Sequence, residues 1–166
     1  MRTHVVVDSP VGPLTVVAEG DALVGLYYHD QRHGPGQDLF GAPTEVGAGP
    51  APFAVVAEQL TAYFAGERTS FELPLAPAGS PFQQRVWAAL RRIPYAQTAT
   101  YGDLARDIGA PGSARAVGLA NGRNPVGIVI PCHRVVGADG ALRGHGGGVE
   151  RKQRLLDLER RRAAPG

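Results

Sequence analysis

The chain has 166 residues, of which 43% are hydrophobic and 19% are charged, and its formal net charge is +2. These values are typical of one globular domain or two small ones and exclude an intrinsically disordered chain. The single cysteine, Cys132, excludes an internal disulfide and a multi-cysteine zinc finger, and no apolar run approaches the ~20 residues that span a bilayer. We therefore expect a cytoplasmic protein with no membrane partner.

The charge is unevenly divided along the chain. Residues 1–80 carry three arginines against nine acidic residues, a net charge of −6, whereas residues 81–166 carry fourteen basic against six acidic residues, a net charge of +8. A basic second half favours contact with a polyanion such as DNA. Solvated basic helices would have the same composition, so charge alone leaves both interpretations open.

The N-terminal part has the pattern of a small antiparallel sheet. Three short runs are rich in Val, Leu and Tyr, and turn-forming residues separate them. The tightest connection, Glu19-Gly20-Asp21, is a hairpin signal. The pattern predicts a three-stranded meander, with strands at residues 3–8, 14–18 and 22–28.

A loop and a helix are expected to follow the meander. Residues 30–51 are rich in Gly, Pro and Gln and lack periodicity, so they are predicted to form a long surface loop. Apolar residues recur at helical spacing over residues 53–65, which predicts a helix. The Pro- and Gly-rich stretch 73–80 then indicates a domain boundary, which divides the chain into residues 1–76 and 77–166.

The second half opens with a complete helix-start signature. Ser80, Pro81 and Gln83 occupy the N-cap, the first helical position and the third position, which is typical of a capping box. Two shorter helices are predicted over residues 101–108 and 113–120, with Ser113 as the cap of the second and a glycine-containing turn between them. This pattern is typical of a helix-turn-helix, although many helical hairpins share it.

The only thiol lies between an apolar run and a polar turn. Residues 128–130 are predicted to form a buried strand that leads to Cys132. A nucleophilic thiolate needs a neighbour that lowers its pKa below about 8.5, and His133 and Arg134 adjoin it in sequence. A small buried cysteine without a chemical role is the alternative. A Gly-rich loop over residues 138–148 and an amphipathic helix over residues 151–162 complete the prediction.

The hexad Ile130-Pro131-Cys132-His133-Arg134-Val135 resembles the active-site signature of the O6-alkylguanine-DNA alkyltransferases. The resemblance covers nearly all of residues 80–160 and implies an α+β fold. A small N-terminal ribonuclease H-like domain with an antiparallel β-meander and a helix would precede a mostly helical C-terminal domain with a winged helix-turn-helix. The other blocks that resemble the family, in the family's order, are residues 82–87, 93–95, 101–105, 114–118, 124–125, and 147–148 before 151–152.

This resemblance implies DNA repair by direct transfer of an alkyl group from O6 of guanine to the protein's own cysteine, once per molecule. The expected partner is double-stranded DNA that contains O6-alkylguanine, bound through its minor groove by a protein that is monomeric when free. No cofactor is expected, because the thiolate is itself the acceptor. No metal is expected, because His29 and His33 have ligand-like spacing without further ligands nearby. O4 of alkylated thymine stays open as a second substrate.

The resemblance also assigns five catalytic roles. Cys132 would be the nucleophile and His133 the general base, acting through a bridging water molecule. Glu159 would orient the histidine, and Tyr101 would donate a proton to guanine N3. Asn124 would tie the turn after the second short helix to the segment that carries the cysteine.

A second set of residues is expected to contact DNA. Arg115 would fill the gap that the extruded nucleotide leaves in the duplex, which offsets an unstacking cost of a few kcal/mol. Small neighbours would let its helix approach the minor groove closely. The other residues expected on this surface are Tyr101, Ala116, Gly118 and Arg123.

A third set is expected to line the pocket for the flipped base. The carbonyls of Cys132 and Val135 would accept hydrogen bonds from the exocyclic amine of guanine, and Arg134 lies between them in sequence. The Gly-rich lid would contribute His145 and Gly146, where the family commonly has Tyr or Phe followed by Ser or Ala. This departure predicts a more flexible lid.

Two other functions compete with alkyl transfer. A binding-only alkyltransferase-like protein would mark alkylated guanine for another repair system, but such a protein lacks a nucleophilic cysteine. A cysteine hydrolase would use the Cys–His pair on an acyl substrate. It would need an oxyanion hole, and it would leave the helix-turn-helix and Arg115 without a role.

Overall fold

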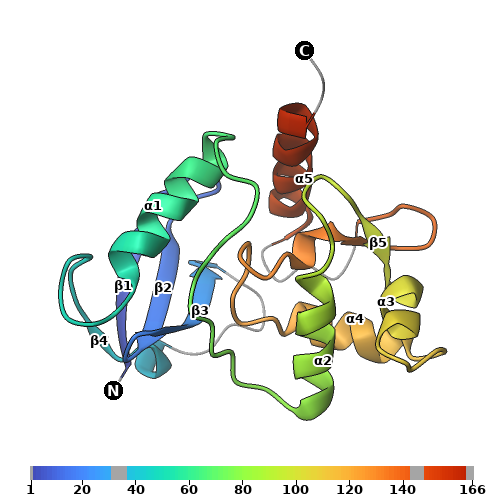
Figure 1. Cartoon of the computed structure of the whole chain (residues 1–166), viewed down its shortest axis with the longest axis horizontal. Coiled ribbons are helices and arrows are strands. Elements are labelled where there is room, and N and C mark those ends of the chain that lie inside the picture. The colour runs from blue at the N-terminus through green and yellow to red at the C-terminus, as the bar shows by residue number, and fades with distance from the viewer. Residues whose placement is uncertain (1, 31–36, 143–147, 164–166) are drawn as a thin grey trace.

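The computed structural model describes residues 2–30, 37–142 and 148–163. Within these ranges, a sheet and one long helix form the N-terminal side of the molecule, and helices make up most of the C-terminal side (Figure 1). This arrangement confirms the α+β class expected from the sequence. No helix in the same ranges is long and apolar enough to cross a membrane.

The N-terminal sheet has the strand order β3-β2-β1-β4. Strand β1 (Arg2–Val7) pairs antiparallel with β2 (Leu14–Glu19), which pairs antiparallel with β3 (Ala22–Tyr28), so the predicted meander is confirmed. A fourth strand, β4 (Ala42–Pro43), pairs in parallel with β1 and follows the short 3-10 helix η1 (Gln37–Phe40). The expected loop therefore holds two elements that are too short to produce periodicity.

Helix α1 (Phe53–Phe64) lies where the apolar spacing predicts it. Its buried apolar residues belong to the same core as those of β2 and β3. Gly66 has a φ of +78°, the left-handed conformation that glycine adopts after a helix end. The buried apolar residues of the helix are Phe53, Val56, Leu60 and Tyr63.

Helix α2 (Pro81–Leu90) begins with the predicted capping box. The Gln83 N–H donates to Ser80 Oγ at 3.1 Å, and the Ser80 N–H donates to Gln83 Oε1 at 2.9 Å. The indole N–H of Trp87 then donates to the Ala120 carbonyl at 2.9 Å and so ties α2 to the helix that carries Arg115.

The two short helices are present with one difference from the prediction. Helix α3 (Tyr101–Asp107) is capped by Thr100, and helix α4 (Ala114–Gly122) follows after a turn. Ser113 occupies the predicted N-cap position of α4, but its side chain makes no capping hydrogen bond within the described chain. The physical reason is its ψ of +25°, because a capping side chain needs extended backbone.

The apolar run 128–130 does not form the predicted strand. A backbone hydrogen bond of 2.8 Å closes a γ-turn around Ile128, whose φ is +70°, and another of 2.7 Å closes a γ-turn around Pro131. Ile128 and Ile130 are each 1% exposed. The run is therefore apolar because it is buried in the core and not because it pairs in a sheet.

The outer edge of β3 joins the two halves of the chain. Leu23 exchanges backbone hydrogen bonds with residues 74–76, and Leu26 exchanges them with residues 125–127. These bonds hold the segment that precedes Cys132 against the N-terminal sheet.

The remaining elements surround the cysteine. The 3-10 helix η2 (Cys132–Arg134) leads into β6 (Val135–Val136), which pairs in parallel with β5 (Ala99–Thr100). Helix α5 (Val149–Ala163) packs against η2 and contains the helix predicted over residues 151–162.

Candidate active site

Cys132 begins η2 and is only 6% exposed. Burial raises the pKa of its thiol, whereas a hydrogen bond from the Asn124 side chain and the positive charge of Lys152 lower it. Lys152 is fully buried on α5, and burial lowers its pKa to about 8 against the opposing effect of the Cys132 charge. Burial in an apolar core therefore disfavours the thiolate, whereas Asn124 and Lys152 favour it.

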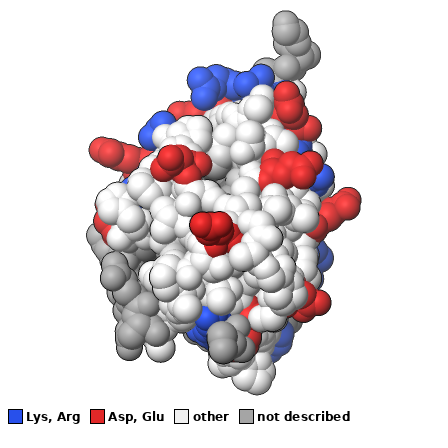
Figure 2. All heavy atoms as spheres, turned by 90° about the vertical axis from the view of Figure 1, so that its left-hand side faces the viewer, with Lys and Arg blue, Asp and Glu red and all other residues white. Residues whose placement is uncertain are grey.

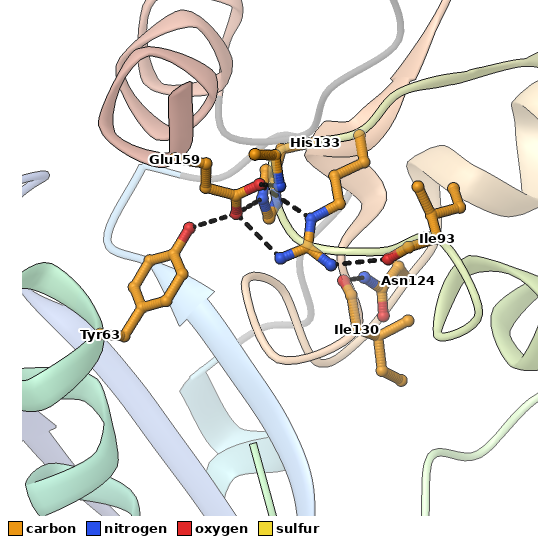
Figure 3. Close-up of polar contacts among 8 residues, drawn as sticks. Tyr63, Ile93, Asn124, Ile130, His133 and Glu159 are labelled. Carbon is orange, nitrogen blue, oxygen red and sulfur yellow. Dashed lines mark hydrogen bonds and ion pairs between the residues drawn. The ribbon is translucent and has the colours of Figure 1, made fainter. Parts of the chain in front are cut away.

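Asn124 follows α4 and holds the turn before the cysteine. Its Nδ2 donates to the Ile130 carbonyl at 2.8 Å, and its Oδ1 accepts from the Val126 N–H at 3.0 Å. Figure 3 shows this amide directed at the Ile130 carbonyl. One side chain thus connects the start and the end of the turn and also reaches the thiol.

Glu159 on α5 is the centre of a buried hydrogen-bond network (Figure 3). His133 Nε2 lies 2.6 Å from Glu159 Oε2, and both side chains are fully buried. Arg134 donates to both carboxylate oxygens, from Nε to Oε1 at 2.9 Å and from Nη2 to Oε2 at 3.0 Å. Burial raises the pKa of Glu159, but the hydrogen bonds and charges of His133 and Arg134 together hold that pKa well below its ordinary value.

This network determines the tautomer of His133. An ionised Glu159 can only accept hydrogen bonds, so the shared proton belongs to His133 Nε2. The pKa of His133 is lowered, mainly because burial disfavours the imidazolium, so the ring is neutral and its lone pair is at Nδ1. Nδ1 is buried and has no hydrogen-bond partner among the described residues. His133 is therefore a neutral base whose accepting nitrogen is not engaged by the described protein groups.

Two further donors to Glu159 were not singled out by the sequence patterns. The Tyr63 hydroxyl from α1 donates to Oε2 at 2.6 Å, and the Ala96 N–H donates to Oε1 at 3.1 Å. Tyr63 lies on the apolar face of its helix, where an aromatic residue is expected for packing alone. Ala96 contributes only its backbone, which no side-chain pattern can indicate.

The residues expected in the base pocket have different surroundings. Val135 is buried at the start of β6. The Arg134 side chain is also buried and donates from Nη1 to the Ile93 carbonyl at 2.8 Å, so its guanidinium is held by this carbonyl and Glu159. His145 and Gly146 lie outside the described residues, and the expected lid stays a prediction. His33 lies outside them too, and no group of three potential metal-ligating residues occurs in the part that is described.

The residues expected to contact DNA gather on α3 and α4. Arg115, Ala116 and Arg123 are exposed, and Gly118 is half-buried with its Cα facing the Tyr101 ring. A Cβ added at Gly118 would lie 3.7 Å from that ring. Leu119, which the sequence patterns did not single out, is 67% exposed one turn after Arg115. The sequence could have indicated this exposure, because Leu119 lies outside the apolar face of α4 that Val117 and Ala120 form.

Two family models together match nearly the whole chain. Residues 3–77 match the model described as 6-O-methylguanine DNA methyltransferase, ribonuclease-like domain. Residues 81–161 match the model described as 6-O-methylguanine DNA methyltransferase, DNA binding domain.

Curated relatives and solved structures agree with these models. A protein of Mycolicibacterium paratuberculosis named methylated-DNA--protein-cysteine methyltransferase is 55% identical over 155 residues, which cover 93% of this chain and 90% of the relative. A Mycobacterium tuberculosis protein of the same name is 51% identical over 157 residues, which cover 95% and 92%.

The fold is also similar to crystal structures of the Mycobacterium tuberculosis protein. The structure titled as its O6-methylguanine methyltransferase has a TM-score of 0.88 at 49% identity and covers 100% of this chain and 97% of that chain. The crystal structure described as Mycobacterium tuberculosis OGT in complex with DNA has a TM-score of 0.87 at 49% identity, and the match covers 97% of this chain and 94% of that chain. The sequence blocks, the buried cysteine site and these similarities lead to one conclusion: the chain belongs to the O6-alkylguanine-DNA alkyltransferase family.

Proposed function

We propose that this protein repairs DNA by moving an alkyl group from O6 of guanine to Sγ of Cys132 in one irreversible turnover. The observation that carries the proposal is that Cys132 and a neutral His133 are consecutive buried residues of η2, and that His133 Nε2 is held by an ionised Glu159. This arrangement provides a nucleophile, a base and a group that stabilises the protonated base.

In the proposed reaction, His133 Nδ1 accepts the thiol proton through one water molecule, and the thiolate attacks the alkyl carbon. The new carbon–sulfur bond forms as the carbon–O6 bond breaks, and the electron pair of that bond stays with guanine. Tyr101 donates a proton to guanine N3, so the leaving base is neutral. Glu159 stabilises the imidazolium, and the charge of Lys152 favours the thiolate.

The proposed DNA contact is the exposed face of α4, placed in the minor groove. Arg115 would occupy the space of the extruded nucleotide, and Leu119 would add an apolar side chain on the same face. Figure 2 shows the N-terminal side of the molecule, where acidic side chains are scattered and basic ones gather toward the end of the C-terminal helix. Because the basic surplus belongs to residues 81–166, we place DNA against the C-terminal side.

We also propose that the chain forms two domains, residues 1–76 and 77–166, which meet along the outer edge of β3. The connecting residues 74–76 run along the outer edge of β3, and the pairing of residues 125–127 with the same strand packs the two parts together. In this proposal α3, α4 and the β5–β6 pair make up the winged helix-turn-helix of the second domain.

One experiment separates alkyl transfer from its two competitors. The protein is incubated with duplex DNA that carries O6-methylguanine with a radiolabelled methyl group. Stoichiometric movement of label to the protein, absent in Cys132→Ala, supports the proposal. Tight binding without movement of label would support the binding-only function. Repeated release of labelled small molecules would support a hydrolase.

A further inference from the structure

Tyr63 connects the N-terminal half of the chain to the carboxylate of the candidate active site. It lies in the last turn of α1 and is fully buried, and its hydroxyl donates to Glu159 Oε2 at 2.6 Å. The same oxygen lies 2.6 Å from His133 Nε2. Figure 3 shows Tyr63 and His133 reaching this carboxylate from different sides. Tyr63 and His133 therefore share the charge of one oxygen atom, to which Arg134 Nη2 also donates at 3.0 Å.

We propose that Tyr63 is a positioning residue for the transfer reaction, with its hydroxyl fixing the Glu159 carboxylate that holds His133. This inference rests on the proposed function, in which His133 is the base. It gives the N-terminal half a role in the chemistry beyond packing, because α1 provides one of the donors to the Glu159 carboxylate.

Three aromatic rings pack around Tyr63 and fix the direction of its hydroxyl. Its ring centroid lies 5.2 Å from that of Phe64, 5.3 Å from that of Phe71 and 6.3 Å from that of Tyr95. Burial and the negative charge of Glu159 both raise the pKa of Tyr63, so the hydroxyl keeps its proton and acts only as a donor here. The ring is held by packing, and removal of the oxygen alone would remove one donor without opening a cavity of ring size.

The loss of this donor has a predictable effect on the base. A hydrogen bond from Tyr63 withdraws charge from Oε2, which makes Glu159 a weaker partner for an imidazolium. Without it, His133 would bind a proton more tightly, and the less constrained carboxylate would hold the ring less well. Besides Tyr63, the charged and titratable groups that face this pair are Lys152 on α5, Arg134 on η2 and Tyr95 in the turn after α2.

The test compares Tyr63→Phe with a matched control, Tyr95→Phe. The Tyr95 hydroxyl is also buried but has no hydrogen-bond partner among the described residues. Second-order transfer rates are measured with free O6-benzylguanine, which needs no DNA contact, from mildly acidic to mildly alkaline pH. For Tyr63→Phe we expect a roughly tenfold lower rate at neutral pH, the factor that corresponds to one charged hydrogen bond. We also expect the acidic limb of the pH profile to move to higher pH. Tyr95→Phe should match the wild type.

The outcomes separate this inference from the proposed function. If the wild type transfers the alkyl group but Tyr63→Phe has the wild-type rate and pH profile, the positioning role is wrong and the proposed function stands. An equal loss at every pH, without a shift of the limb, would mean that Tyr63 only supports the fold. If the wild type transfers nothing, the proposed function itself is wrong.

A second measurement on the wild type covers the case in which Tyr63→Phe does not fold. Two protons donated to one oxygen lie close together, so proton NMR should show a cross-peak between the Tyr63 hydroxyl proton and the Nε2 proton of His133. Histidine labelled with nitrogen-15 identifies the second signal. An Nδ1–H tautomer, or a hydroxyl proton that exchanges as fast as a solvent-exposed one, would overturn the inference.

Discussion

The Asn124 side chain and the Ile130 carbonyl are joined by a buried hydrogen bond of 2.8 Å across the turn that precedes Cys132 (Figure 3). Within this turn, Ile128 has a φ of +70°, which costs a β-branched residue about 1–3 kcal/mol. Such a conformation persists only where the surrounding contacts fix it. The amide of Asn124 and the pairing with β3 provide those contacts, so the position of the thiol depends on both.

Asn124→Ala should therefore destabilise the protein and slow alkyl transfer together. The substitution leaves a buried carbonyl and a buried N–H without their partner, at a combined cost of about 3 kcal/mol. Urea unfolding and transfer rates measure the two effects. The matched control is Asn121→Ala, because the Asn121 side chain is also buried but has no hydrogen-bond partner in the described chain. An equal loss in both variants would contradict a special role for Asn124.

Arg115→Ala should slow repair of O6-methylguanine in duplex DNA by about tenfold or more and leave the reaction with free O6-benzylguanine unchanged. A residue that holds an extruded base out of the stack has no task when the base is already free. The control is Arg91→Ala, which removes the same charge from an exposed position after α2. If Arg115→Ala lost activity equally on both substrates, Arg115 would support the fold rather than DNA distortion.

Stability should fall as the pH decreases below 6.5. The pKa of His133 is lowered from 6.5, so the unfolded chain binds a proton that the folded chain excludes, and acid favours unfolding. Glu159, with a pKa lowered from 4.5, adds to the same trend below that value. Each proton contributes at most about 1.4 kcal/mol per pH unit.

Urea midpoints measured at several pH values test this dependence. His133→Gln keeps a side chain that can donate to Glu159 but removes the titration, so it should flatten the curve between pH 6.5 and 4.5. His29→Gln, which replaces an exposed histidine in the same way, is the control for the substitution itself. A wild-type midpoint that stays constant across this interval would contradict a buried neutral His133.

Ala96→Gly should raise the stability by about 0.5–1 kcal/mol. The Ala96 φ of +65° costs a residue with a Cβ roughly 1–2 kcal/mol, and the greater freedom of glycine in the unfolded chain offsets part of the gain. The N–H that donates to Glu159 is retained. Gly109→Ala is the reverse control, since its φ is +74° and an added Cβ meets nothing within 4 Å. It should lower the thermal midpoint, and a lower midpoint for Ala96→Gly together with a higher one for Gly109→Ala would contradict the strain.

The sequence predicted the parts of the structure whose signals are local. Hairpin residues indicated the meander, and Ser80 with Gln83 indicated the start of α2. The apolar run 128–130 predicts a strand but forms a buried turn, because the two structures require the same run of apolar residues. The contact of Tyr63 with Glu159 joins positions 96 residues apart, and no local pattern contains that information.

The candidate site was predicted mainly through the family resemblance. The resemblance predicts that Asn124, His133 and Glu159 belong to the site of Cys132. In the structure, Asn124 reaches the thiol, and His133, the residue after Cys132, is hydrogen-bonded to Glu159. The number of donors that share Glu159 could not be predicted, because it depends on how α1, α5 and the turn at Ala96 pack together.

The most direct test of the account is the intact mass of the protein after incubation with duplex DNA that contains O6-methylguanine, followed by peptide mapping. The account predicts that each molecule gains one methyl group in place of one hydrogen, that the modified peptide contains Cys132, and that a further excess of DNA adds nothing. An unchanged mass under conditions in which O6-methylguanine disappears from the DNA, or a methyl group on any residue other than Cys132, would contradict it.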